Sequence, residues 1–217
     1  MSTQVTNSTV SESAAPERYV VPTQLRNWLA RRRVAISLVG FIGLVVLNVF
    51  VFKTIPNNPL HLTNPWSLLG WACVGGGLFI RSWAAASLSK SRDLTYWGPY
   101  ALSRNPLYVG SFLMMIGFCV FGRDWLTCAF IVGPLAMLYY AQIEFEEVRL
   151  SGQFPEQWPA YVASTPKVLP LKYSSNMWRA WNGEEWIRNR EYRAIVATAL
   201  GILAVVAWYY ARINLVG

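Results

Sequence analysis

The chain has 217 residues, of which 54% are hydrophobic and only 14% are charged. An average soluble domain is roughly 45–50% apolar and about 25% charged, so the composition excludes an ordinary soluble protein and indicates a membrane protein. The formal net charge at pH 7 is +8. Basic loops beside anionic lipid headgroups explain this charge, and we therefore expect the lipid bilayer, and no nucleic acid, as a partner.

Five apolar stretches are long enough, or nearly so, to cross a hydrocarbon core, which requires about 20 residues and no fewer than roughly 17. They predict an all-α, polytopic integral membrane protein with transmembrane helices at residues 34–52, 66–88, 107–122, 125–143 and 194–211. We therefore divide the chain into an N-terminal arm, 1–33, and a transmembrane domain, 34–211. In the arm, we expect disorder over residues 1–16 and a short interfacial helix over 22–33.

The third and fourth apolar stretches are separated by only Arg123 and Asp124. We expect these two stretches to form a tight helical hairpin that returns the chain to its starting side of the membrane. If the N-terminus is cytoplasmic, 15 of the 19 basic residues fall on the cytoplasmic side. This bias predicts that the N-terminus lies in the cytoplasm. We expect the protein to reside in a bacterial inner membrane.

A polar segment, GPYALSRNPLYVG at 98–110, runs directly into the third apolar stretch. Pro106 suits the first turn of a helix, where its missing N–H costs nothing, and residues 103–105 would supply the cap. Free backbone N–H groups and the positive end of the helix dipole would then lie beside Arg104, an arrangement that favours anion binding. The alternative is that Arg104 only snorkels to the interface and sets the topology.

A second polar segment, QIEFEEVRL at 142–150, leaves the fourth apolar stretch, and the hairpin brings it to the same membrane face as the first. Helical spacing places Tyr139, Gln142, Glu146 and Arg149 on one stripe. Glu144 and Glu147 share a different face. A carboxylate at the end of a span is costly unless it is paired or functional, so Glu146 and Glu147 predict a site. The alternative is an ordinary solvated helix end.

Three other features leave alternatives open. Arg81 lies inside the second apolar stretch, where it either snorkels, pairs with a carboxylate or takes part in catalysis. Gly75, Gly76 and Gly77 either allow close helix packing or admit a ligand. The Trp-rich tract 173–193 is either an anchoring helix on the membrane surface or a lid over a site. The three cysteines are odd in number and lack metal-ligand spacing, so they predict neither a disulfide framework nor a metal site.

The two polar segments resemble the integral-membrane methyltransferases, the family that includes isoprenylcysteine carboxyl methyltransferase and the phospholipid methyltransferases. In the first segment the matching positions are Gly98, Tyr100, Arg104, Pro106, Tyr108 and Gly110. In the second and the residues after it they are Glu146, Glu147, Leu150, Phe154, Trp158, Tyr161, Pro166, Leu169 and Pro170. The resemblance covers about residues 70–172, and the tract 173–193 and the last span lie outside it.

The resemblance implies S-adenosylmethionine as cofactor, bound in a pocket at the cytoplasmic face, and a methyl acceptor that enters from the bilayer. Carried over to this sequence, the cofactor contacts fall on Leu94, Thr95, Tyr100, Arg104, Asn105, Pro106, Leu107, Tyr108, Glu146 and Glu147, with the loop from Arg92 to Thr95 folding over them. The catalytic positions fall on Arg104, Gln142 and Glu146. A cation and a helix N-terminus suit the methionine carboxylate, a carboxylate suits the amino group or ribose, and tyrosine faces suit a sulfonium. Catalysis would be mostly positioning in a site without water, and it needs no metal.

Two departures from the family pattern affect the expected substrate. Asn105 stands where the family usually has a histidine, and Gln142 stands where the prenylcysteine enzymes carry an arginine for the acceptor's carboxylate. Without that cation, a carboxylate acceptor would be poorly stabilised in a low-dielectric site. We therefore expect a lipid-soluble or membrane-embedded small acceptor that reacts through nitrogen, sulfur or oxygen, rather than a prenylated cysteine.

Two further functions remain as alternatives. One is a sterol-type membrane reductase, whose NADPH carries an extra phosphate that would require more basic groups than this site offers beside its glutamates. The other is a non-enzymatic membrane scaffold, in which the polar segments only hold the hairpin at the interface.

Overall fold

A computed structural model describes residue 37 and residues 39–89, 93–169, 175–178 and 181–216 of the chain. The arm 1–33 and Arg92 lie outside these residues, as do parts of the tract 173–193. Within the described part, every regular element is a helix, which confirms the all-α prediction.

The elements follow one another in this order along the chain. Residues 39–52 are helical and end in the π-helix η1 (Asn48–Phe52). The remaining elements are α2 (Pro65–Ser87), the 3-10 helix η2 (Gly98–Ala101), α3 (Pro106–Gly122), α4 (Trp125–Phe130), the π-helix η3 (Ile131–Leu135), α5 (Ala136–Gln153), α6 (Trp158–Ser164), the 3-10 helix η4 (Ser175–Trp178), α7 (Gly183–Arg188) and α8 (Tyr192–Val216).

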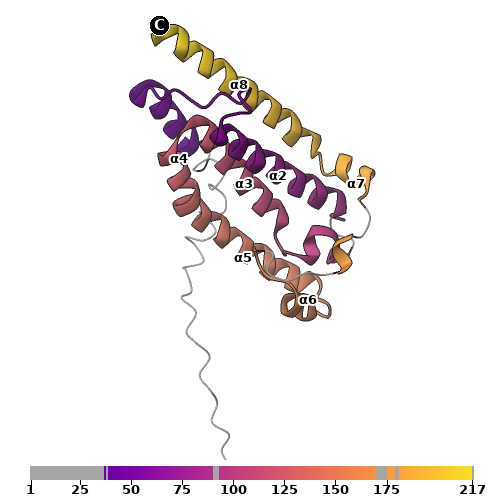
Figure 1. Cartoon of the computed structure of the whole chain (residues 1–217). Helices are drawn as coiled ribbons and strands as arrows, with labels where there is room; N and C mark the ends of the chain where they lie inside the picture. The colour runs from indigo at the N-terminus through magenta and orange to yellow at the C-terminus, as the bar shows by residue number, and fades with distance from the viewer. Residues whose placement is uncertain (1–36, 38, 90–92, 170–174, 179–180, 217) are drawn as a thin grey trace, which may run out of the picture.

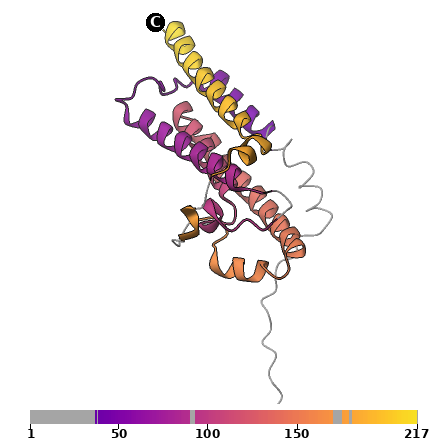
Figure 2. The same ribbon diagram turned by 90° about the vertical axis from the view of Figure 1, so that its right-hand side faces the viewer.

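The long helices lie side by side as a bundle, and the short helices η2, η4, α6 and α7 gather at one of its ends. Figures 1 and 2 show α2 packed along α3, α8 beside α2, and α5 on the opposite side of the bundle from α8. The helices α6 and α7 lie at the end where α2 and α5 finish and α3 and α8 begin (Figure 1). The two polar segments of the sequence therefore fall at the same end of the bundle.

Glycines bring α2 and α3 into backbone contact. A Cβ atom built on Gly77 would lie 2.5 Å from the carbonyl oxygen of Gly110, and one on Gly110 would lie 2.6 Å from that of Gly77. No heavy atom lies within 4 Å of a Cβ built on Gly75, and the nearest to one on Gly76 is 3.6 Å away. The packing role expected for the three glycines is therefore confirmed for Gly77.

Three helices are long and apolar enough to cross a membrane: Pro65–Ser87, Trp125–Gln153 and Tyr192–Leu215. The helices Val39–Phe52 and Pro106–Gly122 are apolar but shorter. Within the residues that the structure describes, five stretches thus form apolar helices at the predicted places, and length and composition identify only three of them as candidate spans. The prediction of five spans is not confirmed.

The hairpin between α3 and α4 has the predicted tight turn. Arg123 ends α3 in the left-handed conformation at φ 50°. Asp124 then caps α4, because its side chain accepts hydrogen bonds from the backbone N–H of Thr127 at 2.9 Å and from its hydroxyl at 2.6 Å. The turn contains only the two residues that the sequence places there.

The second arm of the hairpin is longer than predicted. The elements α4, η3 and α5 form one helix, Trp125–Gln153, which continues ten residues beyond the expected end of the span at residue 143. Pro134 lies within the π-helix η3. A proline has no N–H and its ring clashes with the carbonyl four residues earlier, so the wider π turn fits at this position. Because the helix continues, the glutamates at 144, 146 and 147 are presented on a regular helix face.

Candidate functional site

The approach to α3 is fixed by hydrogen bonds to a distant loop. Pro106 is the first residue of α3 and Asn105 is its N-cap, as predicted, but the Asn105 side chain makes no capping bond. Instead the Asn105 Nδ2 donates to the carbonyl oxygen of Lys167 at 2.9 Å. The backbone N–H of Arg104 donates to the carbonyl oxygen of Pro166, also at 2.9 Å. Residues 103–105 thus supply the N-cap residue, as expected, but no side-chain capping bond, because the loop carbonyl is the partner that the Asn105 side chain reaches.

Glu146 connects the two polar segments directly. Its Oε1 accepts a hydrogen bond from the Tyr108 hydroxyl at 2.7 Å and another from Gln142 Nε2 at 2.9 Å. The ring of Tyr139 packs edge-on against that of Tyr108, with centroids 5.5 Å apart, and edge-on against that of Phe112. These contacts confirm the predicted closeness of the two segments, and they confirm the predicted stripe for Tyr139, Gln142 and Glu146. Both hydrogen bonds to Glu146 come from neutral groups.

Glu147 lies between two cations. Its Oε1 is 3.4 Å from Arg104 Nε and its Oε2 is 3.5 Å from Lys167 Nζ. The Arg104 and Glu147 side chains are only 9% and 15% exposed. At 3.4 Å the two atoms attract each other electrostatically, but neither makes a hydrogen bond. The Arg104 guanidinium also lies over the ring of Trp158, 5.9 Å from its centroid. Arg104, expected to face an anion, thus already has a carboxylate neighbour.

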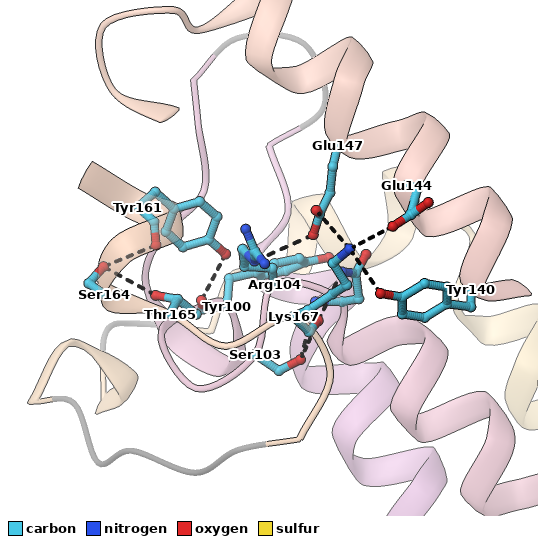
Figure 3. A network of polar contacts seen from close by, with 11 residues as sticks. Tyr100, Ser103, Arg104, Tyr140, Glu144, Glu147, Tyr161, Ser164, Thr165 and Lys167 are labelled. Atoms are coloured by element: carbon cyan, nitrogen blue, oxygen red, sulfur yellow. Dashed lines mark hydrogen bonds and ion pairs between the residues drawn. The ribbon is translucent and has the colours of Figure 1, made fainter. Parts of the chain in front are cut away.

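Lys167 is the site residue that the sequence did not single out. Its Nζ donates to Glu144 Oε1 at 3.3 Å and contacts the hydroxyl and ring face of Tyr140 (Figure 3). Its backbone carbonyl accepts a hydrogen bond from Asn105. Burial lowers the pKa of Lys167, yet the Glu147 carboxylate and the hydrogen bonds to α5 raise it by more, so the pKa lies above its ordinary value. Because it follows α6 in an irregular segment, no helical or strand periodicity could have placed it here.

Tyr100 and the loop before it form the buried floor of the site. The Tyr161 hydroxyl on α6 donates to the Tyr100 carbonyl at 2.9 Å, and η4 lies beside η2. Burial, followed by the nearby acidic groups, raises the pKa of Tyr100, and burial raises that of Tyr161, so both phenols stay neutral. Leu94 and Thr95 are also buried, at 4% and 6% exposed, and Thr95 Oγ1 has no hydrogen-bond partner.

Comparison with known proteins identifies the central part of this structure. Residues 66–157 match the family model described as phospholipid methyltransferase. The match covers less than half of the chain, and it includes α2, η2, the hairpin and the glutamates of α5. Lys167 and the residues that follow it lie outside the matched range.

Two curated relatives share part of the chain. The nickel-cobalt-cadmium resistance protein NccN of Alcaligenes xylosoxydans xylosoxydans is 35% identical over 92 residues, which are 42% of this chain and 43% of the relative. The cobalt-zinc-cadmium resistance protein CzcN of Cupriavidus metallidurans is 33% identical over 115 residues, 52% of this chain and 50% of the relative. The chain thus spans half or less of the length of these relatives. No solved structure matches.

The names of these relatives refer to metal resistance. Among the residues that the structure describes, there is no group of three or more His, Cys, Asp or Glu side chains that could hold a metal ion. The polar chemistry of the site consists instead of carboxylates, phenols, amides and two cations.

Proposed function

We propose that the protein is an S-adenosylmethionine-dependent methyltransferase that acts on a lipid-soluble or membrane-embedded acceptor. The observation that carries this proposal is the 2.7 Å hydrogen bond between Tyr108 and Glu146, which joins the two halves of the family's motif in one place. The Arg104–Glu147 pair, one residue further along α5, joins the same two segments a second time. A single small molecule would then contact both segments at once.

The residues at this place suit the cofactor's charges. A sulfonium and an ammonium group are cations, which favour a carboxylate and the faces of aromatic rings. Glu146 offers a carboxylate that accepts hydrogen bonds from two neutral groups, Tyr108 and Gln142, and that lies beside the rings of Tyr108 and Tyr139. When bound, the cofactor supplies an activated methyl group. The first turn of α3, from Pro106 and Leu107, together with Arg104, would hold its carboxylate.

The remaining cofactor contacts would come from the floor of the site. We assign Tyr100, Leu94 and Thr95 to this role because all three are buried in the segment of the chain that leads into α3. Asn105 would act by fixing the approach to α3, since its side chain already donates to a loop carbonyl. Burial of these groups would exclude water from the reacting atoms, and catalysis would consist mainly of holding the acceptor in line with the methyl group.

The acceptor is one that reacts through nitrogen, sulfur or a hydroxyl. Gln142 carries no charge and its amide donates to Glu146, so this turn of α5 offers the acceptor no cation. A carboxylate acceptor placed here would meet the Glu146 carboxylate without compensation, which is unfavourable in a low-dielectric site. Efficient methylation of a farnesyl-cysteine analogue by the purified protein would contradict this assignment.

Thermal stability in detergent tests the cofactor. A ligand that binds only the folded state at 100 times its Kd stabilises it by about 2.7 kcal/mol. We expect S-adenosylhomocysteine to raise the Tm and NADPH to leave it unchanged. The variants Glu146→Gln and Tyr108→Phe should lose most of the shift, whereas Glu144→Gln, on the exposed side of the same helix, should keep it.

The two alternative functions, a reductase and a scaffold, predict different results in this experiment. Stabilisation by NADPH alone would indicate a sterol-type reductase, and no response to either ligand would favour a scaffold. Incubation of membranes with methyl-labelled cofactor then shows whether the label enters a lipid, a small volatile product or a protein. Absence of label from all three would refute the proposed activity.

A further inference from the structure

The segment 182–191, which lies outside the family match, is docked on the end of α2. The backbone N–H of Asn182 donates to the carbonyl of Ala86 at 3.2 Å. Asn189 Nδ2 donates to the carbonyls of Ala85 at 2.7 Å and Leu88 at 2.9 Å. The last carbonyls of a helix have no partner within the helix, so α7 and its flanks satisfy those of α2. The anchoring of this segment thus has a local explanation.

A partly buried ion pair connects the same segment to Arg81 of α2. Glu191 accepts hydrogen bonds from Arg81 Nε at 2.9 Å and from Arg81 Nη2 at 3.1 Å. The Glu191 side chain is 5% exposed and the Arg81 side chain is 27% exposed. This two-bond geometry fixes the orientation of the guanidinium as well as its charge. The pairing alternative for Arg81 is therefore confirmed.

The remaining nitrogen of the Arg81 guanidinium, Nη1, contacts α3. Arg81 Nη1 donates to Ser111 Oγ, and Ser111 Oγ donates to the carbonyl of Leu107 at 2.7 Å. The stem of Arg81 crosses α3 at Gly110, because a Cβ atom there would lie 2.7 Å from Arg81 Cγ. Leu107 directly precedes Tyr108 in the first turn of α3. A continuous path of hydrogen bonds thus leads from Glu191 to the turn that presents the Tyr108 hydroxyl.

We propose that Arg81, Glu191 and Ser111 are positioning residues, which hold the first turn of α3 in the orientation that the methyl-transfer site requires. The proposal rests on the function proposed above. Anchoring alone does not require these charges, since a buried ion pair can be replaced by apolar side chains of similar volume at little cost in stability. What apolar side chains cannot supply is the directed donor to Ser111.

The decisive variant removes both charges at once. Arg81→Met with Glu191→Met leaves no unpaired buried charge, so we expect it to fold. Hydrogen exchange at the amides of residues 107–111 should become faster than in the unmodified protein. Affinity for S-adenosylhomocysteine should fall about tenfold, as expected when a charge-assisted hydrogen bond that orders the binding turn is lost. Ser111→Ala should show the same two effects and Ser111→Thr, which keeps the hydroxyl, neither.

Trp186→Phe is the matched control. Trp186 Nε1 donates to Ser82 Oγ on α2 at 2.6 Å, so this variant weakens the docking of the same segment without touching α3. We expect unchanged exchange at 107–111. Unchanged exchange there in both the double variant and Ser111→Ala would overturn the proposal, as would equal acceleration by Trp186→Phe. If the unmodified protein does not bind S-adenosylhomocysteine, the proposed function fails, while the exchange comparison still decides the positioning role.

Discussion

Replacement of Glu147 by glutamine should destabilise the protein far more than the same replacement at Glu144. The two glutamates lie three residues apart on α5 and both contact Lys167. They differ in burial, because the Glu147 side chain is 15% exposed and that of Glu144 is 57% exposed. Glu147 also faces Arg104, which is almost fully buried. Glu147→Gln would leave Arg104 without its carboxylate.

The size of the effect follows from this burial. Breaking a buried ion pair by removing one partner costs about 3–5 kcal/mol. Lys167 is 25% exposed and keeps Glu144, and the glutamine keeps one carbonyl oxygen, so we expect about 2–3 kcal/mol for Glu147→Gln. For Glu144→Gln, a surface pair screened by water, we expect no more than about 0.5 kcal/mol.

Thermal unfolding in detergent, followed by circular dichroism, measures the difference. At about 2–4 °C per kcal/mol for a chain of this size, Glu147→Gln should lower the Tm by roughly 5–10 °C and Glu144→Gln by no more than about 2 °C. Lys167→Met should fall between them, because Arg104 remains on Glu147. Equal effects of the two glutamine variants would refute the assignment of Glu147 as the buried counterion.

Three other outcomes follow from the structure. Gly110→Ala should lower the Tm strongly, since its Cβ would overlap the backbone of α2, while Gly75→Ala should not. Asp124→Ala, measured in the same way, should cost about 1–2 kcal/mol through loss of the α4 cap. The pKa values of Lys167 and Tyr161 are raised in the folded state, so their contribution is complete below their unfolded pKa values and lost as pH rises through the folded ones. Stability should therefore be level from about pH 7 to 9 and fall above about pH 10, and Tyr161→Phe should reduce that fall.

The sequence predicted the parts of the site that lie on regular helices. Pro106 indicated where α3 begins, and the two residues between α3 and α4 required a tight turn. Helical spacing then placed Gln142 and Glu146 on one stripe, and the hairpin brought the two polar segments to one face, so their closeness followed from periodicity and connectivity. These inferences needed only local geometry.

The parts of the site that the sequence did not predict depend on contacts between segments far apart in the chain. Lys167 follows α6 in an irregular loop, and nothing in its neighbours indicates which carboxylate it will reach. Glu191 stands 110 residues from its partner Arg81, in a tract whose spacing was compatible with an anchor or a lid. Asn105 was expected to cap α3, but a loop carbonyl supplied from outside the helix was the acceptor within reach.

The π-helix η3 determines which way the glutamates face. A π turn contains one residue more than an α turn, and it stands between the hairpin bend and the site. Deleting a single residue there would rotate everything downstream by about 100°. Glu146 would then turn away from Tyr108 although every polar side chain of the site was still encoded. The rotation of this helix about its axis therefore decides whether the two halves of the site meet. That rotation is set at η3, around Pro134, where no residue of the site lies.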